Sequence, residues 1–243
     1  MVDQEKVVNQ KKVSGAKINY NTLIVPYGKR SKITLSDGTI AWVNSGSKLT
    51  YPSNFDSKFR EVYLEGEASF DVAHDKAHPF KVFTKDQEIE VLGTVFNVSS
   101  YPDDTNHFVV LKSGSVKLKS GLLEKRKLLG NKYNERIITP GTKANFNLKN
   151  HLITEKQVNV EDYFAWINGV LIVKNDDLEH ITKRLSRYYN VSISIENDEI
   201  KEETFSGYLD LKENIVKVLD VLKESTKLNY QIDDTNNINI NIN

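Results

Sequence analysis

The sequence predicts a mainly β protein in which an elongated all-β domain, solenoid-like or sandwich-like, precedes a small α+β domain. Between Leu23 and about Ile153, short runs of alternating apolar and polar residues are separated by turn residues, a pattern typical of half-buried strands. Apolar residues at helical spacing appear only after about Glu155. This change in period divides the chain into an all-β part and a mixed part.

The most regular stretch runs from Arg60 to Val98, where glycines and prolines punctuate an apolar–polar alternation. An Asp37-Gly38 pair between two alternating runs predicts a hairpin, because both residues tolerate the backbone of a tight turn. A second hairpin is expected near Asn147–His151, and Gly121–Glu135 is interpreted as a surface insertion. Further strands are expected at 61–65, 68–73, 80–84, 88–92, 95–100, 107–111, 115–119 and 136–138.

The mixed part predicts the order strand, helix, strand, followed by strand, helix, strand, strand. Asp176 or Asp177 is expected to cap the first helix, and Asn190 to end it. The second helix is expected around Ile215–Leu222. The strands are expected at 171–173, 191–195, 204–208, 228–232 and 238–242.

The predicted organisation is therefore a lead-in or tether over 1–22, an all-β domain over 23–154 and an α+β domain over 155–243. No apolar run approaches the roughly 20 residues that span a bilayer, and the polar start lacks the apolar core of a signal peptide. Two interpretations follow: a cytosolic protein, or one whose N-terminal targeting part lies outside this sequence.

Composition excludes several function classes. The 33 basic and 33 acidic side chains cancel, so the chain lacks the cationic surplus that non-specific nucleic-acid binding requires. The basic run Lys125–Lys127 is interpreted as a solvated loop. The absence of cysteine excludes disulfides, thiolate catalysis and cysteine-ligated zinc.

Ordered blocks lie along the first domain at Pro26–Gly28, Leu35–Gly38, Trp42–Ser47, Leu64–Ala68, Pro79–Phe80, Leu92–Val98, Gly114–Val116 and Pro140–Gly141. In their order and spacing these blocks resemble the FecR domain of anti-sigma factor regulators. The second domain, at Trp166–Leu171, Leu185–Val191 and Phe205–Tyr208, is similar to the C-terminal domain of the Bacteroidetes branch of that family. Two departures are Val173, where the family often has Phe, and the long 121–135 insertion.

The resemblance implies the periplasmic, signal-receiving part of a transmembrane anti-sigma factor. Its implied partner is the signalling domain of a TonB-dependent outer-membrane transporter, which reports the capture of a glycan or an iron chelate. A cytoplasmic segment holding an extracytoplasmic-function sigma factor and one transmembrane helix would lie outside this chain. The resemblance implies no cofactor, no nucleic acid and no enzyme activity, and it likens the α+β domain to the transporter signalling domain itself.

One peptide bond is a candidate for chemistry. The resemblance implies a possible self-cleavage, because some members of the family resemble proteins that cleave themselves at a Gly-Thr bond. The corresponding bond in this chain is Gly93-Thr94. The Thr hydroxyl would attack the preceding carbonyl, and glycine permits the strained backbone that such an attack needs. The alternative is structural: Gly93 allows a tight bend, and Thr94 is a good strand residue.

Other candidate sites have simpler structural interpretations. His74 and His78 are spaced for a shared helix face and a metal, but strands flank them. Glu65, Glu67 and Asp71 are expected on one solvated strand face rather than across a hydrolytic cleft. A set of aromatic residues is expected to pack in the core and between the domains rather than stack on sugars: Trp42, Tyr51, Phe55, Phe70, Phe80, Phe96, Trp166 and Phe205.

Partner binding is expected in the α+β domain, where exposed strand edges can accept another strand. The candidate edges are 191–195, with Val191, Ile193 and Ile195, and 238–242. The second helix is expected to offer a flanking face with the charged residues Lys217, Asp220 and Glu224.

Three function classes compete: a signalling interaction module, a carbohydrate-binding all-β module that senses a glycan directly, and a glycosidase or other hydrolase. Aromatic side chains clustered on an exposed sheet face would favour the second class, and paired carboxylates in a cleft would favour the third.

Overall fold

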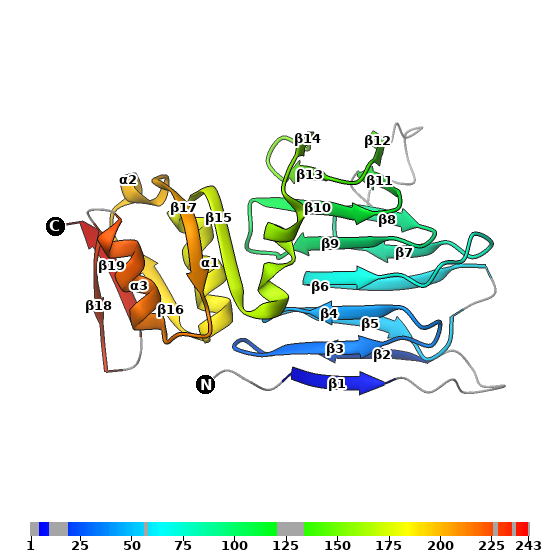
Figure 1. Cartoon of the computed structure of the whole chain (residues 1–243), viewed down its shortest axis with the longest axis horizontal. Helices are drawn as coiled ribbons and strands as arrows, with labels where there is room; N and C mark the ends of the chain where they lie inside the picture. The colour runs from blue at the N-terminus through cyan, green and yellow to red at the C-terminus, as the bar shows by residue number, and fades with distance from the viewer. Residues whose placement is uncertain are drawn as a thin grey trace. The chain divides into compact units, whose positions relative to one another are not determined.

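The computed structural model describes residues 5–9, 19–55, 58–120, 134–225, 228–234 and 237–242. The chain forms two compact units. The sandwich unit comprises 5–25 and 30–160, and the α+β unit comprises 161–243 together with the short segment 26–29. Figure 1 labels the elements of both units. A mainly β fold followed by a small α+β part confirms the predicted fold class.

The sandwich unit is built from two sheets that share the long strand β6 (Arg60–Asp71). Sheet A contains, in order, β1 (Glu5–Asn9), β3 (Arg30–Thr34), β4 (Ile40–Val43), the second half of β6, β9 (Val95–Ser100), β10 (Asn106–Ser113), β13 (Thr142–Asn147) and β14 (Ile153–Gln157). Sheet B contains β2 (Tyr20–Ile24), β5 (Lys48–Pro52), the first half of β6, β7 (Phe80–Phe83), β8 (Gln87–Val91), β11 (Val116–Ser120) and β12 (Asn134–Ile138).

The two sheets face each other across one hydrophobic core. Sheet A contributes Phe70 and Phe96, and sheet B contributes Leu49, Val82 and Ile89 to the same buried cluster. Strands β3, β7 and β13 alternate buried with half-buried residues, as expected where one face of a sheet covers the core and the other does not. Pairing is antiparallel except between β1 and β3 and between β6 and β7.

Strand β6 passes from sheet B to sheet A at Gly66. The predicted strands at 61–65 and 68–73 are therefore one element, which ends at Asp71. Gly66 has φ +104°, and an added Cβ would lie 2.3 Å from the Ser47 Oγ. Only glycine fits this close approach with this backbone.

The hairpin predicted at Asp37-Gly38 joins β3 to β4. Residues 1–22, expected as a lead-in, contribute β1 and the beginning of β2. Most of the expected insertion at 121–135 lies outside the described residues, and its last two residues begin β12.

The α+β unit follows the predicted order of strands and helices, with one short helix, α2, added. Its elements are the 3₁₀ turns η2 (Val160–Tyr163) and η3 (Ala165–Asn168), then β15 (Val170–Asp177), α1 (Leu178–Tyr189), β16 (Ser192–Ile195), α2 (Asp198–Lys201), β17 (Thr204–Asp210), α3 (Ile215–Glu224), β18 (Leu228–Ile232) and β19 (Asn237–Ile242). Strands β15 and β17 form an antiparallel pair, and a second sheet has the order β16-β19-β18.

Local signals set the helix ends. The Asp177 side chain accepts a hydrogen bond of 2.7 Å from the backbone N–H of His180 and caps α1, as predicted. Asn190 closes the helix with the left-handed φ of 55°. The apolar faces of α1 and α3 bury Leu185 and Leu219 in one core with strands from both sheets.

The segment 26–29 packs against the C-terminal end of α1. The backbone N–H of Gly28 donates to the Arg187 carbonyl oxygen over 2.9 Å. Gly28 has φ +72°, and an added Cβ would lie 3.4 Å from the Asn190 Cβ. The Pro26–Gly28 block therefore belongs structurally to the α+β unit.

Candidate functional site

Strand β16 has one edge that no described strand pairs with, so 191–195 remains a candidate for accepting a partner strand. Its other edge pairs in parallel with β19. Val191, Ile193 and Ile195 are half-buried and pack against the core of the α+β unit, while Ser192 and Ser194 are exposed. A partner strand at this edge would thus meet backbone groups and serine side chains.

The expectation that 238–242 offers an edge is wrong. Strand β19 pairs with β16 on one side and with β18 on the other, and Ile238 and Ile240 are buried. Alternation marks a strand, but only the pairing decides whether it is central.

Helix α3 exposes all three charged residues named from the sequence. Lys217 pairs with Glu213 over 2.8 Å, and Glu224 is exposed at the end of the helix. Asp220 accepts a 2.7 Å hydrogen bond from the Tyr230 hydroxyl. Burial and this bond raise the pKa of Tyr230 to about 12, so Asp220 fixes β18 against α3 in addition to facing solvent.

Strand β17 offers a second edge, which the sequence interpretation missed. It pairs only with β15 among the described strands. Phe205 and Leu209 point into the core, while Tyr208 is 60% exposed. The sequence did carry a signal for this exposed edge: Tyr208, next to Gly207, lies among the polar positions of the alternating pattern.

Glu67 lies at the centre of a buried polar network in the sandwich unit. The residue is 4% exposed, and its carboxylate accepts hydrogen bonds from the side-chain amides of Asn44, at 2.8 Å, and Asn97, at 2.9 Å. The expectation that Glu65, Glu67 and Asp71 share one solvated face is therefore wrong for Glu67. The transfer of β6 between sheets at Gly66 places Glu67 in sheet A, next to Ser99 of β9.

The Gly93-Thr94 bond lies just before β9 in a closely packed corner. Thr94 is 3% exposed, and its Oγ1 donates to the Ser115 carbonyl oxygen over 3.1 Å. A Cβ on Gly93 would lie 2.3 Å from the His74 Nδ1, and one on Gly114 would lie 2.6 Å from the Thr94 Oγ1. The two glycines thus allow close packing around Thr94.

The histidines near this corner show no metal geometry. His78 contacts the Asp75 carboxylate over 2.7 Å, and the side-chain hydrogen bond from His78 lowers the pKa of Asp75. Among the residues that the structure describes, no group of three or more His, Asp or Glu side chains is placed to hold a metal ion.

The aromatic residues expected in the core are buried there, except that Phe55 and Trp42 are only partly covered. A different aromatic group lies on the outer face of sheet B. The rings of Tyr63 and Phe83 stack with centroids 5.3 Å apart, and Tyr20 meets Tyr63 edge-on at 6.5 Å. Tyr20 and Tyr63 are 56% and 45% exposed.

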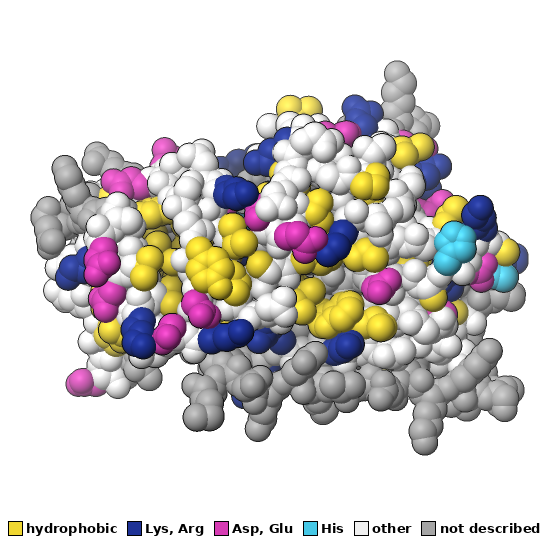
Figure 2. All heavy atoms as spheres, viewed as in Figure 1, with side chains coloured by type: hydrophobic (Ala, Val, Ile, Leu, Met, Phe, Trp, Pro, Cys, Tyr) yellow, Lys and Arg dark blue, Asp and Glu magenta, His cyan; other side chains and the backbone are white. Residues whose placement is uncertain are grey.

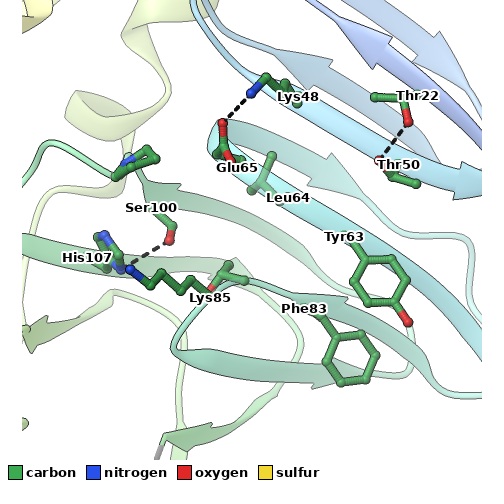
Figure 3. A pocket seen from close by; sticks show the side chains of 12 residues that line it. Thr22, Lys48, Thr50, Tyr63, Leu64, Glu65, Phe83, Lys85, Ser100 and His107 are labelled. Carbon is green, nitrogen blue, oxygen red and sulfur yellow. Dashed lines mark hydrogen bonds and ion pairs between the residues drawn. The ribbon is translucent and has the colours of Figure 1, made fainter. Parts of the chain in front are cut away.

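This aromatic group borders an open groove with a volume of about 420 Å³. Figure 3 shows the stacked rings of Tyr63 and Phe83 on one side, and the Lys48–Glu65 ion pair on the neighbouring strands. The groove is lined by Thr22, Lys48, Thr50, Tyr63, Leu64, Glu65, Phe83, Thr84, Lys85, Ser100, Pro102 and His107.

Charge is mixed over the surface. Figure 2 shows acidic and basic side chains interspersed on the visible face, without a block of one sign. On this face the charges are balanced, in keeping with the zero net charge of the chain. No helix in the described part of the chain is both long and apolar enough to cross a membrane.

Comparison with known proteins finds a family model that matches each of the two units. A family model described as FecR protein matches residues 21–117, and one described as FecR, C-terminal matches residues 170–240. A crystal structure from Parabacteroides distasonis, of a protein provisionally described as an anti-sigma factor, has 26% identity and a TM-score of 0.82, covering 92% of this chain and 99% of that one. A second structure described in the same words has 26% identity and a TM-score of 0.83, covering 93% and 100%.

A comparison with curated proteins finds no significant match. The paired domain matches and the shared fold define a signalling regulator of the anti-sigma-factor class. The chain belongs to the FecR family.

Proposed function

We propose that this chain is the periplasmic signal-receiving part of a transmembrane anti-sigma factor. The observation that carries the proposal is the succession of a FecR domain and a FecR C-terminal domain, together with the likeness to the Parabacteroides protein over 99% of its length. A cytoplasmic segment and a membrane helix outside this chain would connect it to an extracytoplasmic-function sigma factor. No turnover is required for this role.

The α+β unit is the proposed receiver for the signalling domain of a TonB-dependent outer-membrane transporter, which reports a bound glycan or iron chelate. The open edge of β16 supports strand addition, in which backbone hydrogen bonds supply affinity. The N–H of Glu196 points to the Ile240 carbonyl of β19. Because alternate N–H groups along a strand point the same way, those of Ile193 and Ile195 point to the open edge.

The direct test is calorimetric titration of the whole chain with the purified signalling domain of the transporter encoded beside it. We expect a micromolar dissociation constant, in the range of transient signalling interfaces. Lys217→Glu and Glu224→Lys should weaken binding and change its salt dependence, because rim charges steer association. Lys149→Glu, on an exposed turn of the sandwich unit, is the matched control. No binding at tens of micromolar would refute the proposed partner.

Hydrogen exchange of the complex locates the edge without a substitution. Binding at β16 should protect the amides of Ile193 and Ile195, because their N–H groups would enter a new ladder. Protection of the Ser206–Tyr208 amides instead would show that the partner binds at the edge of β17.

A further inference from the structure

The outer face of sheet B carries a groove that the signalling role does not use, and we propose that it binds a neutral oligosaccharide. The groove is formed within the sandwich unit by β2, β5, β6 and the end of β7 with the turn after it, and Ser100 of β9, Pro102 and His107 of β10 close it on the side of sheet A. It is independent of the α+β unit proposed to receive the transporter.

The groove follows from a single row of cross-strand neighbours. Thr22 lies opposite Thr50, Thr50 opposite Tyr63, and Tyr63 opposite Phe83. Because side chains alternate between faces, all four project to the outer face. The same row continues along sheet B through Glu88, Lys119 and Glu135. One end of this face is thus hydroxyl-bearing and aromatic, and the other is a ladder of charges.

The aromatic end has the geometry of a stacking platform. Tyr63 and Phe83 lie nearly parallel, with an interplanar angle of 24°, and Tyr20 stands at 62° to Tyr63. A pyranose ring presents C–H groups on its faces, and these weakly positive hydrogens pack on the electron-rich face of an aromatic ring. The exposure of Tyr20 and Tyr63 leaves ring surface available for such packing.

The polar lining matches sugar hydroxyls, which both donate and accept hydrogen bonds. The Thr22 and Thr50 hydroxyls lie 2.9 Å apart, and the Lys48 Nζ lies 2.7 Å from the Glu65 Oε1. This ion pair offers donors and acceptors with no net charge, so the charges inside the groove do not call for a charged ligand. Lys85, exposed at the rim, adds one positive charge to the lining, and the acidic probe below tests whether that charge selects an acidic saccharide.

The size of the groove suits a short saccharide. Its volume of about 420 Å³ falls within the range of about 300–1,000 Å³ typical of small-ligand sites. Among the described strands, β2 pairs only with β5 and so forms an edge of sheet B beside the groove. Aromatic side chains on an exposed sheet face are also the feature that sugar sensing requires of an all-β module.

The test is isothermal titration of the whole chain with cellotetraose, xylotetraose, mannotetraose and maltotetraose at millimolar concentration. Tetragalacturonate serves as the acidic probe, and an apolar hexapeptide serves as the strand-addition probe. We expect at least one neutral tetrasaccharide to bind. Tyr63→Ala should weaken that binding about tenfold or more, as loss of a central aromatic anchor does. Thr50→Val, which keeps the side-chain shape, should also weaken it.

Ile137→Ala is the matched control, because Ile137 is 65% exposed on β12 at the other end of sheet B and does not line the groove. It should bind as the parent does. Absence of binding by all four neutral tetrasaccharides would overturn the proposal, as would binding that Tyr63→Ala leaves unchanged. Binding of the acidic probe alone, or of the hexapeptide alone, would overturn it in favour of that ligand. None of these outcomes affects the transporter titration.

Discussion

The guanidinium Nη1 of Arg60 lies 2.8 Å from the Asp37 Oδ2, and both side chains are almost enclosed. Arg60 also donates to the carbonyl oxygens of His78 and Ala73, while Asp37 accepts from the backbone N–H and the hydroxyl of Thr39. The first residue of β6 thus ties the β3–β4 hairpin to the loop after β6. An acidic residue in this turn therefore holds distant segments together as well as shaping the turn.

Asp37→Asn should destabilise the sandwich unit by about 3 kcal/mol, because the Arg60 charge would stay buried without its partner. Chemical unfolding at neutral pH measures the change. Glu65→Gln is the matched control, since Glu65 pairs with Lys48 at the surface and its loss should cost less than about 1 kcal/mol. Equal costs for the two substitutions would show that enclosure of the Arg60–Asp37 pair does not matter.

The ionised Glu88 carboxylate should make part of the free energy of unfolding depend on acid pH. Burial alone would raise its pKa, but hydrogen bonds from Lys81 and Lys119 lower the pKa below the ordinary value of 4.5. A carboxylate with a lowered folded pKa stabilises the protein above its unfolded pKa, and this stability disappears as pH falls through the folded pKa.

Glu88→Gln should therefore cost about 1–2 kcal/mol at neutral pH, where the parent carboxylate holds both lysines. The difference between parent and variant should shrink below about pH 4.5 and vanish once Glu88 is protonated in the folded state. Unfolding curves measured from neutral to strongly acidic pH would check this. A difference that does not change with pH would contradict the role assigned to the ionised carboxylate.

Gly66→Ala should be among the most damaging single-methyl changes in the chain. The new Cβ would meet the Ser47 Oγ at 2.3 Å and the Ser47 Cα at 2.8 Å, at a φ of +104°. Strain and overpacking together should cost about 3 kcal/mol or more. Thermal unfolding with soluble yield is the measurement.

Gly38→Ala separates backbone strain from overpacking. Gly38 has φ +89° but nothing within 4 Å of an added Cβ, so only the backbone strain remains, about 1–2 kcal/mol. If the two alanine variants lose the same stability, close packing at the β6 crossing is not what requires Gly66.

Local sequence signals predicted correctly the turns and helix ends, which depend on residues adjacent in the chain. Asp37-Gly38 marked a hairpin, and Asp177 and Asn190 marked the ends of α1, because caps and turns are set by neighbours in sequence. The burial of Glu67 and the central position of β19 were missed, because both depend on which strands pair across long separations. The Tyr20, Tyr63 and Phe83 group was missed for the same reason: three separate strands bring its members together.

The Gly93-Thr94 bond should stay intact in the purified protein. A hydroxyl that attacks the preceding carbonyl must leave its present acceptor. The Thr94 Oγ1 donates to the Ser115 carbonyl oxygen, and Thr94 is only 3% exposed. Hydrolysis of the resulting ester would also need water in this packed corner. Intact mass spectrometry after long incubation should therefore give one species of full mass. Two fragments divided between Gly93 and Thr94 in the parent, but absent from Thr94→Ala, would establish self-cleavage and refute this prediction.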